Sequence, residues 1–161
     1  MSLLGCSGGG SSGPDRIGDR AEFTGRAAAI CGEVVSRRNA NPDYAKDRRA
    51  ILEALVAVRG KGLPAADAIA ALDRAVREFE HTTRDLARVR STDATWAAAW
   101  AEVADAVRGD TQVYRDRRAA VRAGDPATLA AAFDPGRLAS DIGAPLTRLN
   151  LAERDCRLLL R

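Results

Sequence analysis

The residues best suited to chemistry in this sequence are few, and the first is the single histidine, His81. Glu78 precedes it by about one helical turn and Asp85 follows it by about one, so the three would lie on one side of a helix. Glu-x-x-His is half of a motif that binds a di-iron centre in helical bundles, and the other half needs a second histidine. The helical register places His81 on an outward face. We therefore expect a solvated polar face and no metal site.

Other catalytic and cofactor chemistries also lack the residues they need. No Gly-x-Ser-x-Gly turn surrounds a serine, and any serine or cysteine nucleophile would need the same lone histidine as its base. The only methionine is Met1, and the glycine run Gly8–Gly10 is not followed by the lysine of a P-loop. We expect no catalytic residues and no cofactor, with an unrecognised carboxylate chemistry as the one catalytic alternative.

The three cysteines differ in their sequence context. Cys6 lies in a glycine-serine stretch, whereas Cys31 and Cys156 lie in segments typical of packed helix or its immediate neighbour. We predict a Cys31–Cys156 disulfide, which would close a loop of nearly the whole domain and stabilise it by about 5 kcal/mol in the chain-entropy model. Such a bond implies an oxidising compartment. The alternative is two buried, reduced thiols.

Aromatic residues make up only 4% of the chain, and Trp96 and Trp100 lie one helical turn apart. Together with Tyr44, Phe79 and Tyr114, they are the candidate lining of a ligand pocket between helices. The alternative is that the two tryptophans are core residues. We expect this first, because tryptophan is a usual filler of bundle interiors.

The charges are nearly balanced, with 25 lysines and arginines against 22 acidic residues. A nucleic-acid-binding surface needs clustered charge of one sign to displace phosphate counterions, so we expect no nucleic-acid partner. The densest basic run is Arg115, Arg117, Arg118 and Arg122, interrupted by Asp116. It is typical of a soluble surface, and the alternative is a contact with an acidic partner or with anionic lipid headgroups.

Apolar residues at spacings of three and four predict the helices that must position these side chains. The predicted stripes are Phe23, Ala27, Ile30 and Val34; Tyr44, Ile51, Leu55 and Val58; Ile69, Leu72, Val76, Phe79, Thr83 and Leu86; and Trp96, Trp100, Val103, Val107, Tyr114 and Val121. Asn41-Pro42, Pro64 and the caps Ser91 to Asp93 begin helices two to four. We expect a weak point at Gly109-Asp110 and a helix end near Gly124.

A last helical region begins at Asp125-Pro126, continues through Leu129 and Phe133, and is interrupted at Asp134-Pro135-Gly136. Short connections favour antiparallel neighbours. The predicted fold class is therefore all-α, an up-and-down bundle of four to five helices over residues 21–161, with one disulfide. No strand alternation competes with it.

Leu3-Leu4-Gly5-Cys6, followed by a glycine-serine tail, resembles the start of a mature bacterial lipoprotein. The resemblance implies that Cys6 carries a diacylglycerol anchor, and we expect the signal segment to lie outside this sequence. Residues 1–20 would then be a lipoprotein-type N-terminus and a flexible linker spanning about 20 Å. No other segment is long and apolar enough to cross a bilayer.

The wider layout resembles the uncharacterised small secreted lipoproteins of high-GC Gram-positive bacteria, in which an alanine-rich helical domain carries two cysteines. Ala29-Ile30-Cys31 in the first helix and the leucine-rich segment from Leu149 to Cys156 carry this likeness. The resemblance implies export and anchoring to the outer face of the cytoplasmic membrane through lipidated Cys6. It implies no activity.

These observations lead to one functional expectation and one alternative. We expect a non-catalytic, lipid-anchored cell-envelope protein whose bundle binds an envelope protein or supports envelope structure. Its contact with the membrane would be through the anchor only. The alternative is a small-molecule-binding module with a pocket between helices near Trp96 and Trp100.

Overall fold

A computed structural model describes residues 16–138, 141–151 and 156–160 of the chain. Within these ranges it contains six α-helices and two 3-10 helices, so the predicted all-helical class is confirmed. The helix count exceeds the predicted four to five because the last helical region divides at Asp134-Pro135-Gly136 and again before Gly143. Cys6 lies outside the described residues.

The first helix lies where the sequence predicted it, but the next two begin later than predicted. The second begins at Tyr44 and not at Asn41-Pro42, and the third begins at Asp67 and not at Pro64. Helix α1 (Arg20–Ala40) begins at Asp19, whose carboxylate accepts a hydrogen bond from the Glu22 amide at 2.8 Å. It buries the whole predicted stripe from Phe23 to Val34. Helix α2 (Tyr44–Arg59) follows after the break at Pro42.

Helix α2 turns a different face inward from the one the sequence predicted. Its buried residues are Asp47, Ala50 and Ala54, whereas Ile51 and Leu55 are only partly buried. The small alanines allow α2 to lie close to α3, which leaves the larger residues of the predicted stripe beside an interior space.

Helices α3 (Asp67–Leu86) and α4 (Ala94–Ala123) form the most extensive helix pair. Asp93 caps α4 by accepting hydrogen bonds from the amides of Thr95 and Trp96, and Gly124 ends it in the left-handed conformation with φ of 68°.

The predicted weak point at Gly109-Asp110 is wrong, because α4 continues through it without a break. Gly109 costs about 1 kcal/mol relative to alanine in a helix, a modest cost against burial of the helix face around it. Asp110 is buried there rather than exposed at a turn.

The remaining elements complete the domain. They are α5 (Pro126–Ala132), η1 (Pro135–Leu138), α6 (Gly143–Arg148) and η2 (Cys156–Leu160). The structure also contains two short parallel strands that the sequence did not predict, β1 (Arg16–Ile17) and β2 (Arg90–Ser91). Two residues are too few to give a strand periodicity.

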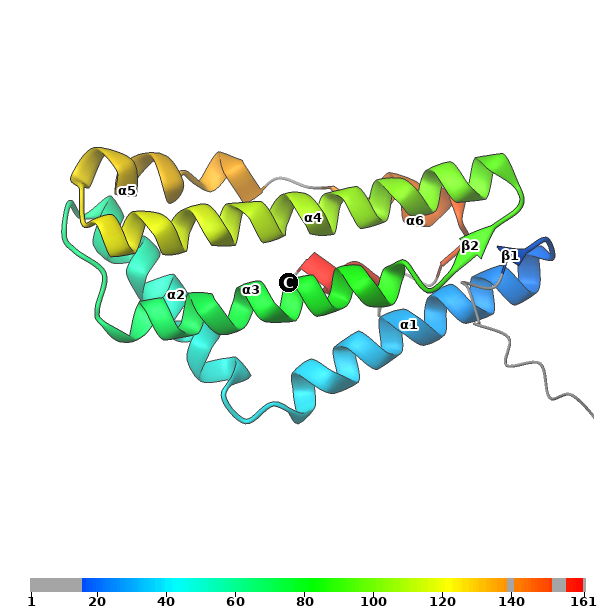
Figure 1. The fold of residues 1–161 in the computed structure, drawn as a ribbon, viewed down its shortest axis with the longest axis horizontal. Helices are drawn as coiled ribbons and strands as arrows, with labels where there is room; N and C mark the ends of the chain where they lie inside the picture. The colour runs from blue at the N-terminus through cyan, green and yellow to red at the C-terminus, as the bar shows by residue number, and fades with distance from the viewer. Residues whose placement is uncertain (1–15, 139–140, 152–155, 161) are drawn as a thin grey trace, which may run out of the picture.

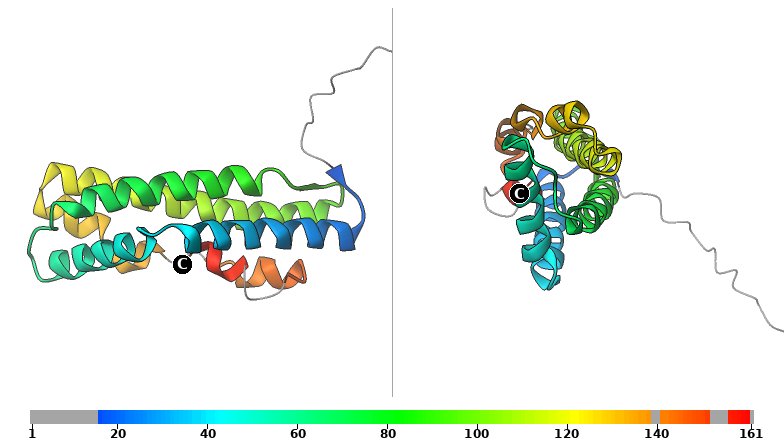
Figure 2. Two further views of the ribbon diagram at one scale, coloured as in Figure 1. Left: turned by 90° about the horizontal axis from the view of Figure 1, so that it is seen from below. Right: turned by 90° about the vertical axis from the view of Figure 1, so that its left-hand side faces the viewer.

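The helices lie along one long axis in four passes (Figure 1). Helices α1 and α2 together run in one direction, α3 returns, α4 runs back beside it, and α5, η1 and α6 make the last pass. Seen end-on, the helices lie around a common long axis (Figure 2). Helix η2 then turns back against α1.

The predicted disulfide is confirmed. Cys31 in α1 is bonded to Cys156 at the start of η2, across a sequence separation of 125 residues, and both residues are buried. The bond therefore fastens the last described turn of the chain to its first helix.

The buried apolar residues form two separate clusters. The disulfide-side core joins α1, the second half of α3, the first half of α4, α6 and η2, and includes Phe23, Cys31, Trp100, Leu149 and Leu159. The α5-side core joins α2, α3, α5 and the end of α4. Its members are Ala54, Ala68, Leu72, Ala120, Leu129, Ala132 and Phe133. Among the described helices, none is both long and apolar enough to span a membrane.

Replacing both Cys31 and Cys156 by alanine is expected to lower the free energy of unfolding by about 2–5 kcal/mol, because the unfolded chain gains the freedom that the long closed loop had removed. Urea denaturation under non-reducing conditions measures this. The parent should carry Cys6→Ala in every sample, to prevent mispairing. An unchanged urea midpoint in the double variant would contradict the expectation.

Candidate functional site

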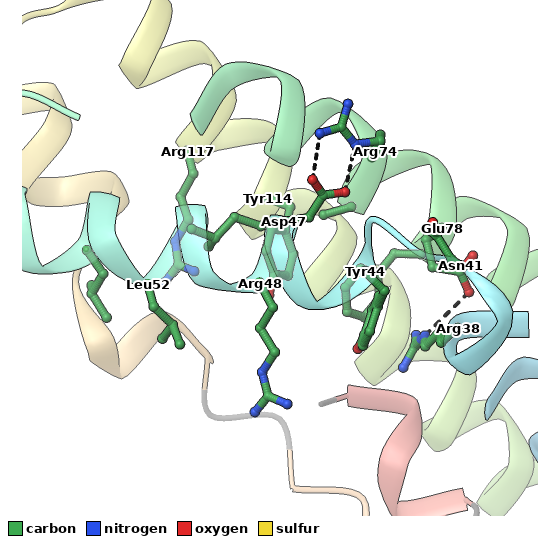
Figure 3. A pocket seen from close by; sticks show the side chains of 14 residues that line it. Arg38, Asn41, Tyr44, Asp47, Arg48, Leu52, Arg74, Glu78, Tyr114 and Arg117 are labelled. Carbon is green, nitrogen blue, oxygen red and sulfur yellow. Dashed lines mark hydrogen bonds and ion pairs between the residues drawn. The ribbon is translucent and has the colours of Figure 1, made fainter. Parts of the chain in front are cut away.

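A cavity of about 300 Å³ lies between the end of α1, α2, α3 and α4 (Figure 3). It is lined by Arg38, Asn41, Tyr44, Asp47, Arg48, Ile51, Leu52, Leu55, Arg74, Ala75, Glu78, Phe79, Tyr114 and Arg117. Its walls thus combine aliphatic and aromatic side chains with four arginines and two carboxylates.

The apolar part of the cavity is formed by α2, α3 and α4. The ring of Tyr114 stacks on that of Phe79, with centroids 5.0 Å apart. Ile51 and Leu55 line the cavity from α2, and Leu52 beside them is 53% exposed. Because Leu52 both lines the cavity and meets solvent, it marks an apolar side of the cavity mouth.

Arg38 occupies one end of the cavity. It is only 5% exposed, and its Nη1 and Nη2 donate hydrogen bonds to the carbonyls of Leu158 and Leu159 at 2.7 and 2.9 Å. Its Nε donates to Glu78 Oε1 at 3.3 Å, and its guanidinium lies over the Phe79 ring at 5.2 Å. A buried guanidinium needs such partners, and Arg38 obtains them from α3 and η2.

The residues weighed earlier as metal ligands belong to an arginine-centred network instead. Arg37 donates to Glu78 Oε1 at 3.1 Å and to Asp85 Oδ2 at 2.8 Å. Burial alone would lower the pKa of Arg37, but the Glu78 and Asp85 carboxylates outweigh it and raise that pKa. His81 is largely exposed and lies 3.8 Å from Asp85 Oδ1. Among the described residues, no group of three or more His, Cys, Asp or Glu side chains is placed to hold a metal.

The second lining carboxylate is also held by an arginine. Asp47, buried on α2, accepts two hydrogen bonds from Arg74 of α3, from Nε at 2.7 Å and from Nη2 at 2.6 Å. This bidentate contact is the geometry in which an arginine and a carboxylate bind each other most strongly. Both cavity carboxylates are therefore already neutralised by protein cations.

Arg117 lies toward the other end of the cavity, with Tyr44 and Tyr114 between it and Arg38 in the view of Figure 3. It is 2% exposed, and its guanidinium lies over the rings of Tyr114 and Phe133 at 5.6 and 5.3 Å. Its Nε donates to the Ala132 carbonyl at 3.3 Å, whereas its Nη2 is buried without a hydrogen-bond partner among the described residues.

Burial governs the ionisation of this part of the cavity. It lowers the pKa of Arg117, although Tyr114 and Asp110 act in the opposite direction, and it raises the pKa of the Tyr114 hydroxyl. An arginine remains a cation at neutral pH even with a lowered pKa. The cavity therefore contains a positive charge that its surroundings do not fully compensate.

The structure brings together three of the five predicted pocket residues. Tyr44, Phe79 and Tyr114 line the cavity, but Trp96 and Trp100 do not. Both tryptophans pack against Phe23, each with ring centroids 6.1 Å apart, and Trp100 Nε1 donates to the Leu86 carbonyl at 3.0 Å. The tryptophans lie in and against the disulfide-side core, as expected first from the sequence, and they do not line this cavity.

Sequence reasoning missed the two buried arginines, although a signal for them exists. The apolar stripe of α1 continues from Val34 to Arg38, four residues later, and Arg117 falls between Tyr114 and Val121 on the stripe of α4. A charged residue in the register of an apolar stripe indicates a buried charge.

The rest of the basic run in α4 lies on the surface and is paired. Arg115 contacts Glu80, and Arg118 and Arg122 both contact Asp73 on α3. The run therefore consists of one buried arginine and three surface arginines whose ion pairs join α4 to α3.

Comparison with known proteins found no matching family model, no similar curated protein and no similar solved structure.

Glu78→Ala is expected to lower the free energy of unfolding by about 1–3 kcal/mol, because it leaves donors of Arg37 and the buried Arg38 without their shared carboxylate. Glu33→Ala is the matched control on α1. Glu33 forms an exposed ion pair with Arg88, and its loss should cost about 0.5 kcal/mol or less. Equal urea midpoints for the two variants would contradict the structural role given to Glu78.

Proposed function

We propose that this domain is a non-catalytic binding module of the cell envelope, which holds a small, largely apolar molecule in the cavity between α2, α3 and α4. The observation that carries the proposal is the cavity itself, with aliphatic and aromatic walls and a volume of about 300 Å³. Pockets for small ligands begin at about this size and combine apolar walls with a few polar groups.

The composition of the lining supports binding rather than catalysis. The described residues that line the cavity include no serine, cysteine or histidine, and each lining carboxylate is held by an arginine. A carboxylate fixed in an ion pair is a poor general base, because the cation stabilises its charged form. The proposal therefore has no catalytic residue and no cofactor.

The location of the domain is part of the same proposal. Its Cys31–Cys156 bond supports an oxidising compartment outside the cytoplasm. The lipoprotein-like start of the sequence supports an anchor at Cys6 on the outer face of the membrane. We also take the four passes of helix as the up-and-down bundle that the sequence predicted, with its first and last passes broken.

Binding of an envelope protein is the second candidate function. Leu52 and Val56 lie one turn apart on α2, 53% and 69% exposed, and Leu63 follows α2 at 68%. Clustered exposed apolar side chains are typical of interaction surfaces. This surface adjoins the cavity at Leu52, so a protein contact and a ligand would share α2.

The neutral fluorescent probe N-phenyl-1-naphthylamine should bind the purified domain saturably with one site, because it is apolar and needs no charge partner. Ala75→Trp fills the cavity from α3 and should abolish the signal, whereas Ala70→Trp on the exposed face of the same helix should not. Fluorescence titration measures both. Equal binding by the two variants, or no binding by the parent, would overturn ligand binding and leave the protein contact through α2.

When the chain is exported in a high-GC Gram-positive host behind a lipoprotein signal segment, it should enter the detergent phase in a Triton X-114 partition. Cys6→Ala should move it to the aqueous phase, because a diacylglycerol supplies the apolar surface that holds it there. Cys6→Ala protein that stays in the detergent phase, or parent that never enters it, would refute the anchor.

A further inference from the structure

We propose that the molecule bound in this cavity is a monocarboxylate with an apolar body, and that Nη2 of Arg117 binds its carboxylate. This inference rests on the proposed function and adds to it the chemical class of the ligand. It assigns to Arg117 the role of an anion-binding residue.

The first step is the state of Arg117 in the domain. Its side chain is 2% exposed and lines the cavity, and its Nη2 is itself covered, with no hydrogen-bond partner among the described residues. A ligand would reach Nη2 when the guanidinium turns toward the cavity. A buried donor left unsatisfied is costly, and more so on a charged group. Arg38 is similarly buried, but both of its terminal nitrogens donate hydrogen bonds to carbonyls of η2. The contrast indicates that Arg117 keeps a donor for a group from outside the protein.

The second step concerns the charges around that donor. The lining carboxylates Asp47 and Glu78 are bonded to Arg74, Arg37 and Arg38, so neither is free to neutralise Arg117. Asp110 acts on Arg117 from within α4, but burial still outweighs it. Arg48 adds a further exposed cation to the lining. An anionic group would enter a cavity that retains positive charge.

The third step limits the size and charge of the ligand. A single buried cation suits a monoanion, whereas a phosphate dianion would need more donors and would meet the nearby carboxylates. The stacked rings of Phe79 and Tyr114, with Ile51 and Leu55, suit an apolar body. A cavity of about 300 Å³ favours a medium chain of roughly ten carbons.

Decanoate and decanol test this class directly, because they differ at one end only. Each is titrated below its aggregation concentration against the domain loaded with N-phenyl-1-naphthylamine. We expect decanoate to displace the probe at least about tenfold more tightly than decanol, the advantage of one hydrogen bond to a charged donor. Equal displacement by the two overturns the carboxylate and leaves the proposed function intact. No probe binding at all refutes the proposed function itself.

Variants assign the preference to a residue. Arg117→Met should bring decanoate down to the affinity of decanol without changing that of decanol, since methionine keeps the length and removes the charge. Arg118→Met, on the same helix and paired with Asp73, is the matched control and should keep the preference. If Arg48→Met removes the preference instead, the assignment to Arg117 is overturned. Circular dichroism checks that each variant folds. If Arg117→Met does not fold, the displacement of the probe from the parent domain by decanoate and by decanol still tests whether the ligand is a carboxylate.

Discussion

The burial of two guanidinium groups in the middle of a small helical domain is the constraint on which the rest of the structure depends. A buried cation requires carbonyls, carboxylates or aromatic faces around it. Arg38 obtains them from α3 and from the carbonyls of η2, and Arg117 from α5 and two rings. Arg38 contacts Phe79 and Leu159 of the disulfide-side core, whereas Arg117 contacts Ala132 and Phe133 of the α5-side core. The interior is therefore apolar at both ends and polar at its centre, where the cavity is found.

Much of the fold was predictable because the buried face of a helix follows from the spacing of apolar residues along the local sequence. The stripe of α1 and the cap at Asp93 were read correctly, and the disulfide followed from the context of Cys31 and Cys156. The two-residue strands were not predictable, since pairing between distant segments leaves no local pattern. Gly109 was misread because its helix propensity was weighed without the packing of α4 on α3.

The candidate site was predictable only in part, and the reason is physical. Aromatic residues can fill a core or line a cavity, and the choice depends on which neighbours are large. Trp96 and Trp100 meet Phe23, whereas Tyr114 and Phe79 lie across from α2, where Ala50 and Ala54 take the buried positions. The alanines bring α2 close to α3 and leave Ile51 and Leu55 beside open space. No single helix stripe contains that information, because it depends on two helices at once.

The Cys31–Cys156 bond also determines how the domain would carry mechanical load. A pull applied at the two ends of the chain would pass through the residues before Cys31, across the sulfur bridge, and out beyond Cys156. All of α2, α3, α4 and α5 lie inside the covalent loop, so the covalent path of the force bypasses them. The force would act first on the segments outside the loop, which are the first turns of α1 and the turn η2. Because the carbonyls of η2 hold Arg38, stretching would reach the cavity through that one end and leave the α2, α3 and α4 walls inside the loop.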